Sequence, residues 1–445
     1  MKLLFISLGC DKNLVDTEVM LGLLAGRGYE MTDDETQADV IIINTCCFVH
    51  DAKQESVDTI LEMAQYKSNG ILKALIVTGC LAQRYKQEIL DEVPEVDAVL
   101  GTTAYDKVLN AVDAVLGGQH IVRMEDLQAL PLVDTKRQVT TGGHYAYLKI
   151  AEGCDKNCTY CIIPKVRGRY RSVPMERLVA EAETLAEQGV KELILVAQET
   201  TVYGKDLYGE KRLPELLGKL CRISGLRWIR ILYCYPEEIT DELIRVIREE
   251  PKICHYLDIP IQHASDAILK RMGRRTSKQE LTEMIGKLRR EIPDICLRTT
   301  LITGFPGETK EQHEELLEFI DEMEFDRLGV FTYSQEEDTP AAEMPDQIPE
   351  EVKEERQAEL MELQQEIAFD NAERMIGREV LVMIEGKVAD EPVYVGRTYR
   401  DAPDVDGLIF IETGEELLSG DFAKVTVTGA QEYDLIGGLS DELTE

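Results

Sequence analysis

Three cysteines on one short segment carry the clearest chemical signal in this chain of 445 residues. Cys154, Cys158 and Cys161, here called the loop cysteines, are spaced as CxxxCxxC in the run CDKNCTYC. Three thiolates on one loop can bind three irons of a 4Fe-4S cluster and leave the fourth iron open to a small molecule. A structural zinc site needs four closed ligands, often with histidine, and the nearest following histidine is His255. The spacing therefore favours an iron-sulfur cluster over zinc or unrelated thiols.

A second set, here called the dispersed cysteines, consists of Cys10, Cys46 and Cys80. Each comes one to three residues after an apolar run that we predict to be a strand. Their separations match one strand-helix-strand unit each, and the carboxyl ends of parallel strands share one edge of a sheet. We therefore expect these thiols to meet in space and to form a second cluster site. Cys47 competes with Cys46, but Cys46 directly follows the strand end, so we choose Cys46 and treat Cys47 as a packing residue.

The elements that position these cysteines predict an α/β fold in three parts. Residues 1–118 alternate strand and helix patterns, which is typical of a doubly wound parallel sheet. Residues 119–139 are expected to be a linker. Residues 140–372 contain six further strand-helix units, which predict an open, partial (βα)6 barrel related to the TIM architecture. The loop cysteines follow its first strand, on the face where such barrels place active sites. The expected strands are 3–8, 40–43 and 74–77 in the first part and 145–150, 192–196, 228–232, 256–259, 297–301 and 328–331 in the second.

The last part of the chain changes pattern. Residues 349–374 read as an acidic helical connector, and residues 375–441 as a small all-β barrel with strands at 379–384, 407–412 and 423–428. Between residues 375 and 439 there are 5 Lys and Arg against 13 Asp and Glu, a balance of −8. A barrel with this charge is expected to bind nucleic-acid phosphates poorly.

The charge of the whole chain points the same way. With 84 acidic against 49 basic residues the formal charge is −35. This charge favours a basic macromolecule as partner and argues against direct binding of nucleic acid. The same charge could serve only to prevent association. The start has no signal-peptide pattern and no apolar run is long enough to span a membrane. We expect a cytoplasmic protein with reduced cysteines, and a monomer because no repeat or heptad suggests otherwise.

At this point several segments resemble the methylthiotransferases of the radical S-adenosylmethionine superfamily, over nearly the whole chain. The terminal barrel resembles a TRAM domain. The segments that carry the resemblance are SLGCDKNLVDTE (7–18), NTCCF (44–48), TGCLAQRY (78–85), AQETTVYG (197–204), LDIPIQHAS (257–265) and TGFPGET (303–309).

This family has two branches, one acting on an adenosine of tRNA and the other on an aspartate of ribosomal protein uS12. The start GCxKNLVDxE and the segment RDAPDVDG at 400–407 resemble the ribosomal-protein branch, whereas tRNA enzymes typically have Gln and Met after that cysteine. Asp11 stands where the branch usually carries Pro. The acidic terminal barrel agrees, because uS12 is basic and tRNA is anionic. A tRNA adenosine methylthiotransferase is the alternative, and a non-enzymatic iron-sulfur or zinc sensor is the alternative of another class.

The resemblance implies two 4Fe-4S clusters and S-adenosylmethionine as cofactors. The loop cysteines would hold the cluster whose open iron chelates S-adenosylmethionine. With an electron donor, its cleavage would yield a 5′-deoxyadenosyl radical that takes hydrogen from the aspartate β-carbon. The dispersed cysteines would hold an auxiliary cluster carrying the sulfur, and a further S-adenosylmethionine would give the methyl group. Both strand edges must then face one substrate, so the two α/β parts should stack edge to edge.

No side chain beyond the cluster ligands is assigned a catalytic role. Six residues are expected to contact the cofactor, with a structural role as the alternative for each. Tyr160 would pack beside the adenine, Arg298 would take the carboxylate, and Gly304 would allow close approach of the backbone. The others are Gln198, Glu199 and Gln262, at predicted strand ends.

Overall fold

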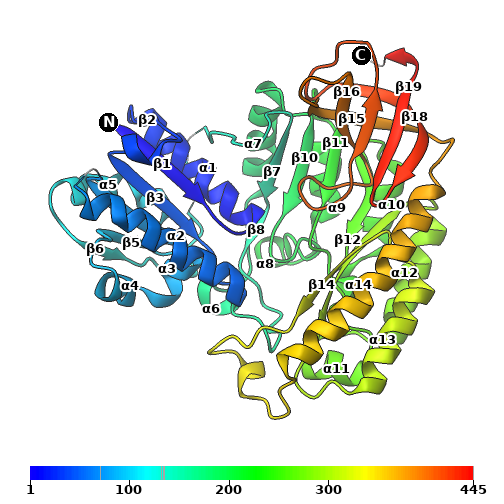
Figure 1. Ribbon diagram of the computed structural model, residues 1–445, viewed down its shortest axis with the longest axis horizontal. Coiled ribbons are helices and arrows are strands. Elements are labelled where there is room, and N and C mark those ends of the chain that lie inside the picture. Colours follow the sequence, from blue (N-terminus) through cyan, green and yellow to red (C-terminus); the bar gives the residue numbers. More distant parts are fainter. Residues whose placement is uncertain (71, 132, 134–135, 444–445) are drawn as a thin grey trace.

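The computed structural model describes residues 1–70, 72–131, 133 and 136–443 of the chain (Figure 1). An α/β unit formed by the first part of the chain lies beside an open barrel, and a small closed barrel caps one end of that open barrel. The layers agree with the α/β class expected from the sequence.

The first sheet has six parallel strands in the order β2-β1-β3-β4-β5-β6. Helices α1 and α5 cover one face, and α2, α3 and α4 cover the other, so the sheet is doubly wound. Every residue of β3 and β4 is buried, as expected for central strands with helices on both faces. The sheet continues through β6, beyond residue 118, where the sequence predicted a linker. Its strands are β1 (Lys2–Ser7), β2 (Glu30–Met31), β3 (Val40–Thr45), β4 (Ala74–Gly79), β5 (Ala98–Leu100) and β6 (Ile121–Arg123). Its helices are α1 (Asp11–Gly26), α2 (His50–Ser68), α3 (Cys80–Tyr85), α4 (Gln87–Glu92) and α5 (Val108–Leu116).

The second sheet also has six parallel strands, in the order β14-β13-β12-β11-β10-β7. Among the described residues β7 and β14 are edge strands, so the barrel is open, as predicted. Its strands are β7 (Tyr145–Lys149), β10 (Glu192–Val196), β11 (Trp228–Ile231), β12 (Ile253–Asp258), β13 (Cys296–Thr303) and β14 (Arg327–Thr332). Its helices are α7 (Met175–Glu187), α8 (Lys205–Tyr208), α9 (Leu213–Leu220), α10 (Asp241–Glu249), α11 (Asp266–Arg271), α12 (Lys278–Glu291) and α13 (Lys310–Met323).

The segment with the loop cysteines extends out from this barrel as an excursion whose two ends are held together. Two short strands, β8 (Ala151–Glu152) and β9 (Arg171–Ser172), pair antiparallel at its base. Between them lie the cysteine loop and the helix α6 (Ile163–Arg167). Short 3-10 helices occur elsewhere, as η1 (Glu35–Gln37), η2 (Tyr105–Lys107), η3 (Pro236–Glu238) and η4 (Pro340–Glu343).

The long helix α14 (Glu350–Glu373) packs along β14 and leads into the closed barrel, whose strand order is β15-β16-β17-β19-β18. Three of its strands were expected, and β16 and β19 were not. The strands are β15 (Glu379–Lys387), β16 (Val393–Thr398), β17 (Ile409–Glu412), β18 (Phe422–Gln431) and β19 (Asp434–Leu443).

The small barrel packs against one end of the open barrel. Phe422 packs edge-on against Trp228 with ring centroids 4.9 Å apart, and Trp228 is the first residue of β11. At the same end, the buried carboxylate of Glu192 binds Arg230 at 2.7 Å and Arg397 of the small barrel at 2.8 Å. The small barrel therefore covers the amino ends of the strands and leaves the carboxyl ends to the site. Within the described ranges, no helix has the length and apolarity needed to cross a bilayer.

Candidate active site

The dispersed cysteines lie at the carboxyl ends of three neighbouring strands. Cys10 precedes α1, Cys46 follows β3, and Cys80 begins α3 directly after β4. Strands β1, β3 and β4 are adjacent in the sheet, which brings together thiols that are 70 residues apart in the chain. Gly9 has φ +88°, and a Cβ there would lie 2.7 Å from Cβ of Cys46, so a side chain would displace that cysteine.

These three thiols are close enough to influence one another. Burial raises the pKa of Cys46 to about 12, with further contributions from Cys80 and Cys10. Cys10 is the exposed member of the set, whereas Cys46 and Cys80 are buried. Cys47 is fully buried in the same apolar core as Cys80. Burial raises the pKa of Cys80 as well, so binding of a metal group would have to displace the protons of Cys46 and Cys80.

The loop cysteines gather in the excursion after β7. Cys154 accepts a hydrogen bond from the backbone N–H of Lys156 at 3.5 Å, and burial raises the pKa of Cys154 to about 12. Burial, followed by the neighbouring Cys158, raises the pKa of Cys161. Asn157 adopts φ +54°, a left-handed conformation that turns the loop between two of the cysteines.

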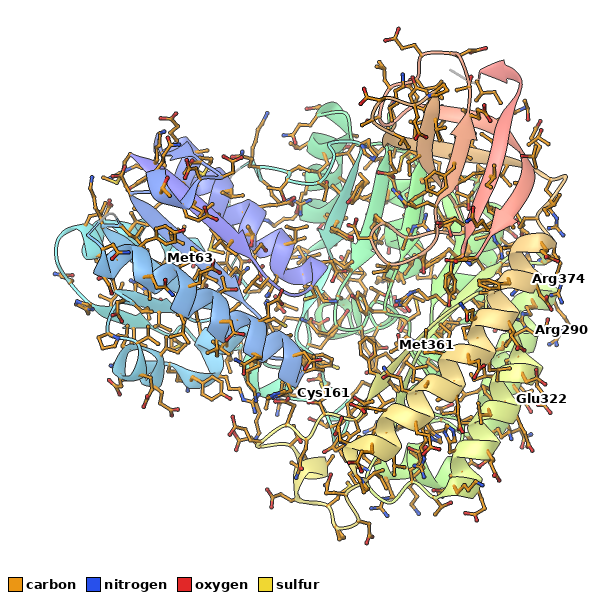
Figure 2. All side chains as sticks on the ribbon, viewed as in Figure 1. Met63, Cys161, Arg290, Glu322, Met361 and Arg374 are labelled. Atoms are coloured by element: carbon orange, nitrogen blue, oxygen red, sulfur yellow. The ribbon has the colours of Figure 1, made fainter. Side chains whose placement is uncertain are left out.

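Helix α6 joins the two cysteine sets. It begins two residues after Cys161, and Ile162 and Val166 pack into the core of the first α/β unit against α3. At its end, Nε of Arg167 donates a hydrogen bond to Sγ of Cys80 at 3.3 Å. Figure 2 shows Cys161 at the junction of the α/β unit with the open barrel. One five-residue helix therefore connects one cysteine set with the other.

Arg167 is the centre of a buried charge network. Its guanidinium binds Asp16 at 2.8 Å and Glu152 at 3.1 Å. Lys149 donates to both carboxylates, with 2.8 Å to Glu152. Gln198, one of the expected cofactor contacts, donates to the other oxygen of Glu152 at 2.9 Å. Two cations and two anions balance each other here, which is the condition for burying them.

A different arginine lies beside the loop cysteines. Arg274 is 6% exposed, lies 4.2 Å from the ring centre of Tyr235 and donates from Nη2 to the carbonyl of Pro260. Its Nε and Nη1 have no hydrogen-bond partner within the described part of the chain. The hydroxyl of Tyr235 lies 3.8 Å from Sγ of Cys158. Buried donors of this kind fit an anionic group at this position.

The other expected cofactor contacts have varied surroundings. Tyr160 stacks edge-on with Phe305, with ring centroids 6.5 Å apart. Glu199 is 2% exposed, and burial raises its pKa to about 7 although Lys156 lies 3.5 Å away. Gln262 adopts φ +71° in the loop after β12. Left-handed conformations of non-glycine residues concentrate at functional sites.

Arg298 and Gly304 are engaged by protein groups. Arg298 binds Asp258 at 3.0 Å and Asp406 of the small barrel at 3.4 Å, so a cofactor carboxylate would have to share or replace these partners. At Gly304 a Cβ would lie 2.3 Å from Cγ of Lys353 in α14. The close approach at this glycine is therefore to α14.

The residues present fit iron-sulfur clusters. Among the described residues, no group of three or more His, Cys, Asp or Glu is arranged to hold a single metal ion. Thiolates that bind different corners of a cluster lie farther apart than the ligands of one ion. Thiols in threes, with Arg167 donating to one set and Arg274 N–H groups that lack partners among the described residues beside the other, suit a negatively charged cluster. The assignment of the six cysteines as ligands remains a prediction.

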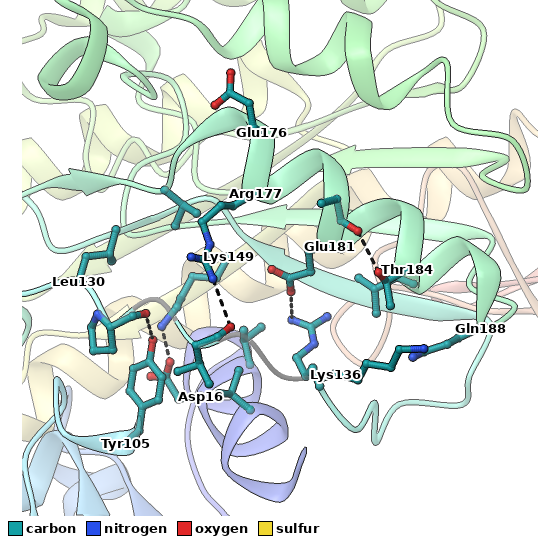
Figure 3. Close-up of a pocket in the computed structure, with 18 residues that line it drawn as sticks. Asp16, Tyr105, Leu130, Lys136, Lys149, Glu176, Arg177, Glu181, Thr184 and Gln188 are labelled. Carbon is teal, nitrogen blue, oxygen red and sulfur yellow. Dashed lines mark hydrogen bonds and ion pairs between the residues drawn. The ribbon is translucent and has the colours of Figure 1, made fainter. Parts of the chain in front are cut away.

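A cavity of about 580 Å³ lies between α1, α7 and the segment before Arg137 (Figure 3). Asp16 and Lys149 point toward one another on its wall. None of the six cysteines is among its described lining residues. The cavity therefore contacts the Arg167 network through Asp16 and Lys149 but is separate from the two cysteine sets.

Sequence reasoning missed the polar residues that surround the thiols. Arg167 is one of several basic residues after the cysteine loop, and nothing in the spacing distinguishes it. Arg274 lies in the basic run RMGRR (271–275), and Tyr235 and Tyr233 lie in a loop without a recognisable pattern. Lys12 belongs to the GCxKN segment, which was used only to recognise the family. Only the folded chain shows what these side chains contact.

Known families match each part of the chain. Residues 2–101 match the family described as "Uncharacterized protein family UPF0004", residues 148–320 match the radical SAM superfamily, and residues 376–439 match the TRAM domain. Among solved structures, the radical S-adenosylmethionine methyltransferase TsrM from Kitasatospora setae is similar with a TM-score of 0.56 and 14% identity, over 76% of each chain. At that identity the likeness shows the fold alone. Fold and site thus define a radical SAM protein with an additional three-cysteine unit.

Curated relatives identify the family within this class. The ribosomal protein uS12 methylthiotransferase RimO of Lachnoclostridium phytofermentans is 68% identical over 98% of this chain and 99% of the relative. The protein of the same name from Clostridioides difficile is 50% identical over the full length of both. The chain belongs to the RimO family of radical SAM methylthiotransferases.

Proposed function

We propose that this protein inserts a sulfur atom and a methyl group at the β-carbon of an aspartate of ribosomal protein uS12. The observation that carries the proposal is that two three-cysteine sets, joined by α6, occur in a chain of this family. A reaction that needs a radical and a sulfur source at one carbon needs two such sites next to each other. The net change replaces a β C–H bond by a C–S–CH3 group.

The proposed cofactors are two 4Fe-4S clusters and S-adenosylmethionine. The loop cysteines would hold one cluster and the dispersed cysteines the other. When bound, these groups supply the radical that removes hydrogen, the sulfur atom and the methyl group, with electrons from a reduced donor. The protein's own part is to hold the clusters, orient the cofactor and exclude water from the radical.

Several side chains are placed for those tasks. Tyr160 and Glu199 lie around the loop cysteines and would contact the cofactor. Arg167 and Arg274 supply positive charge beside buried thiolates, which lowers the cost of burying anionic clusters. The closed barrel covers the amino ends of the strands, so the substrate must approach from the carboxyl ends.

The proposed substrate also has consequences for the partners, the cellular location and the oligomeric state of the enzyme. The chain carries a net charge of −35, which suits a basic protein substrate and disfavours direct contact with nucleic acid. Because uS12 is a ribosomal protein, we place the reaction in the cytoplasm. We propose that the enzyme works as a monomer, since both cysteine sets of the site come from one chain.

Mass spectrometry of both candidate substrates tests this function. The enzyme, reconstituted anaerobically with iron and sulfide, is incubated with reductant, S-adenosylmethionine and either uS12 or tRNA. We expect a methylthio group on one aspartate of uS12 and none on tRNA. Modified tRNA with unmodified uS12 would favour the sibling activity instead. Cluster uptake without release of 5′-deoxyadenosine would favour the sensor.

A further inference from the structure

A pair of charged residues lies beside the exposed member of the dispersed cysteines. Asp11 and Lys12 directly follow Cys10 and form the first turn of α1. Lys12 Nζ binds Asp11 Oδ1 at 2.9 Å, and each side chain is 8% exposed. This pair lies where the first α/β unit meets the open barrel, because both residues contact Tyr233 in the loop after β11.

The two oxygens of Asp11 are used very differently. Oδ1 accepts from the backbone N–H and the ammonium of Lys12 and from the hydroxyl of Tyr233 at 3.1 Å. Oδ2 is buried and has no hydrogen-bond partner within the ranges that the structure describes. A buried carboxylate oxygen without a donor is costly, and such atoms commonly mark the place of a ligand.

The ammonium of Lys12 retains capacity for a second anion. It lies 3.3 Å from the ring centre of Tyr233 and pairs with the single carboxylate of Asp11. An ammonium has three donors, and these contacts use only part of them. Lys149 and Arg167, the other cations near the dispersed cysteines, each bind two carboxylates. Lys12 is therefore the cation of this region best able to accept a carboxylate from outside.

Tyr233 holds this pair in place. It adopts φ +59°, a strained conformation for a tyrosine, and its backbone N–H donates to Asp258 at 3.1 Å. Asp258 is the last residue of β12 and also binds Arg298. The charged pair is thus fixed relative to the strand ends of the open barrel.

We propose that Lys12 binds the side-chain carboxylate of the substrate aspartate, and that Asp11 Oδ2 accepts a hydrogen bond from the residues flanking that aspartate. The inference rests on the proposed function. The carboxylate carbon of an aspartate is one bond from the β-carbon. That β-carbon must reach the sulfur of the cluster proposed for the dispersed cysteines. Lys12 is next to Cys10, the exposed cysteine of the set, which is where a substrate can approach. A basic substrate supplies donors for Asp11.

Binding of two peptides tests this role. One is a uS12 peptide with the target aspartate, and the other has asparagine in its place. For the wild-type holoenzyme we expect tighter binding of the aspartate peptide, by about 10- to 100-fold, the range for a charge-assisted hydrogen bond. Lys12→Met should remove this preference by weakening only the aspartate peptide, and Lys12→Arg should restore most of it. Lys310→Met is the matched control, because Lys310 is 81% exposed on α13 and should leave the preference intact.

The outcomes separate the inference from the function on which it rests. Equal binding of both peptides by the wild type would overturn the role of Lys12, even if its variants fail to fold. So would Lys12→Met weakening both peptides equally, which is what a structural role predicts. A wild-type enzyme that leaves uS12 unmodified would instead reject the proposed function. Steady-state kinetics add a second readout, because Lys12→Met should raise KM for the aspartate peptide while Lys12→Arg returns it toward the wild-type value.

Discussion

The two cysteine sets reach similar surroundings by opposite routes. The loop cysteines lie within eight residues of one another on a single excursion, whereas the dispersed cysteines come from three strand ends spread over 71 residues. The first set is arranged by one loop and the second by the tertiary structure of a whole sheet. A local change in the sheet should therefore affect the dispersed set without disturbing the other.

The cations beside the two sets differ as well. Arg167 donates to Cys80 and is balanced by two carboxylates, so its charge is already compensated. Arg274 lies beside Cys158, and two of its nitrogens, Nε and Nη1, have no hydrogen-bond partner among the described residues. A compensated cation contributes mainly a directed hydrogen bond, whereas an uncompensated one contributes its full charge. Loss of Arg274 should therefore change the properties of its cluster more than loss of the hydrogen bond from Arg167.

The largest effect is expected from removing either set of thiols. Alanine at Cys154, Cys158 and Cys161 should abolish cleavage of S-adenosylmethionine and leave the other cluster in place. Alanine at the three dispersed cysteines should spare cleavage and stop sulfur insertion. Iron content, 5′-deoxyadenosine and methylthiolated uS12 are measured together. Product formed by either triple variant would show that the roles are wrongly assigned.

The next effect in size is expected at Arg274. Arg274→Met removes a buried positive charge and its donors, so the cluster at the loop cysteines should become harder to reduce. A hydrogen bond to a charged group is worth about 1.5–3 kcal/mol, which corresponds to roughly 60–130 mV for one electron. A redox titration followed by electron paramagnetic resonance measures the shift.

Arg274→Lys is the control for that prediction. It keeps the charge and loses the planar fork, so it should lie between the wild type and Arg274→Met. A shift of the cluster at the dispersed cysteines in place of the other would contradict the assignment.

The contrast between the sets also explains what the sequence could predict. The CxxxCxxC spacing is local, so it is visible without a fold. The dispersed cysteines could be grouped because the strands before them are apolar runs with a parallel-sheet pattern, and β1, β3 and β4 form as neighbours. In the small barrel, β16 and β19 were missed because Gly, Arg and Asp interrupt their alternation. There, pairing with β15, β17 and β18 overrides weak local preference.

The polar residues around the thiols could not be predicted in this way. Arg167 contacts Asp16, which lies 151 residues earlier in the chain, and Tyr233 contacts Asp11, 222 residues earlier. Neither pair has a spacing that a periodic pattern could reveal. Such contacts depend on how the two α/β units dock, which is decided by the packing of α6 and α1.

A smaller effect is expected at Arg167. Arg167→Lys keeps the positive charge among the carboxylates but loses the rigid fork that reaches Cys80. An ordinary hydrogen bond to sulfur is worth about 1 kcal/mol. The reduction potential of the cluster at the dispersed cysteines should therefore fall by about 40 mV. The redox titration should show no change at the loop cysteines. Arg167→Met is less informative, because it leaves two buried carboxylates, Asp16 and Glu152, to share the single cation Lys149 and should destabilise the fold by about 3–5 kcal/mol.

The smallest effect is expected at Tyr235. Its hydroxyl lies 3.8 Å from Sγ of Cys158, a long contact for a hydrogen bond even to sulfur. Tyr235→Phe removes only that hydroxyl and keeps the ring that packs on Arg274. We expect a shift of roughly 20 mV to lower potential at the loop cysteines, from about 0.5 kcal/mol, with the dispersed cysteines unaffected. Tyr160→Phe, at the neighbouring tyrosine, shows whether any hydroxyl nearby has the same effect. If Tyr235→Phe shifted the potential as far as Arg274→Met does, the hydroxyl and not the guanidinium would be the main donor, and the difference between the two cysteine sets would have to be explained without Arg274.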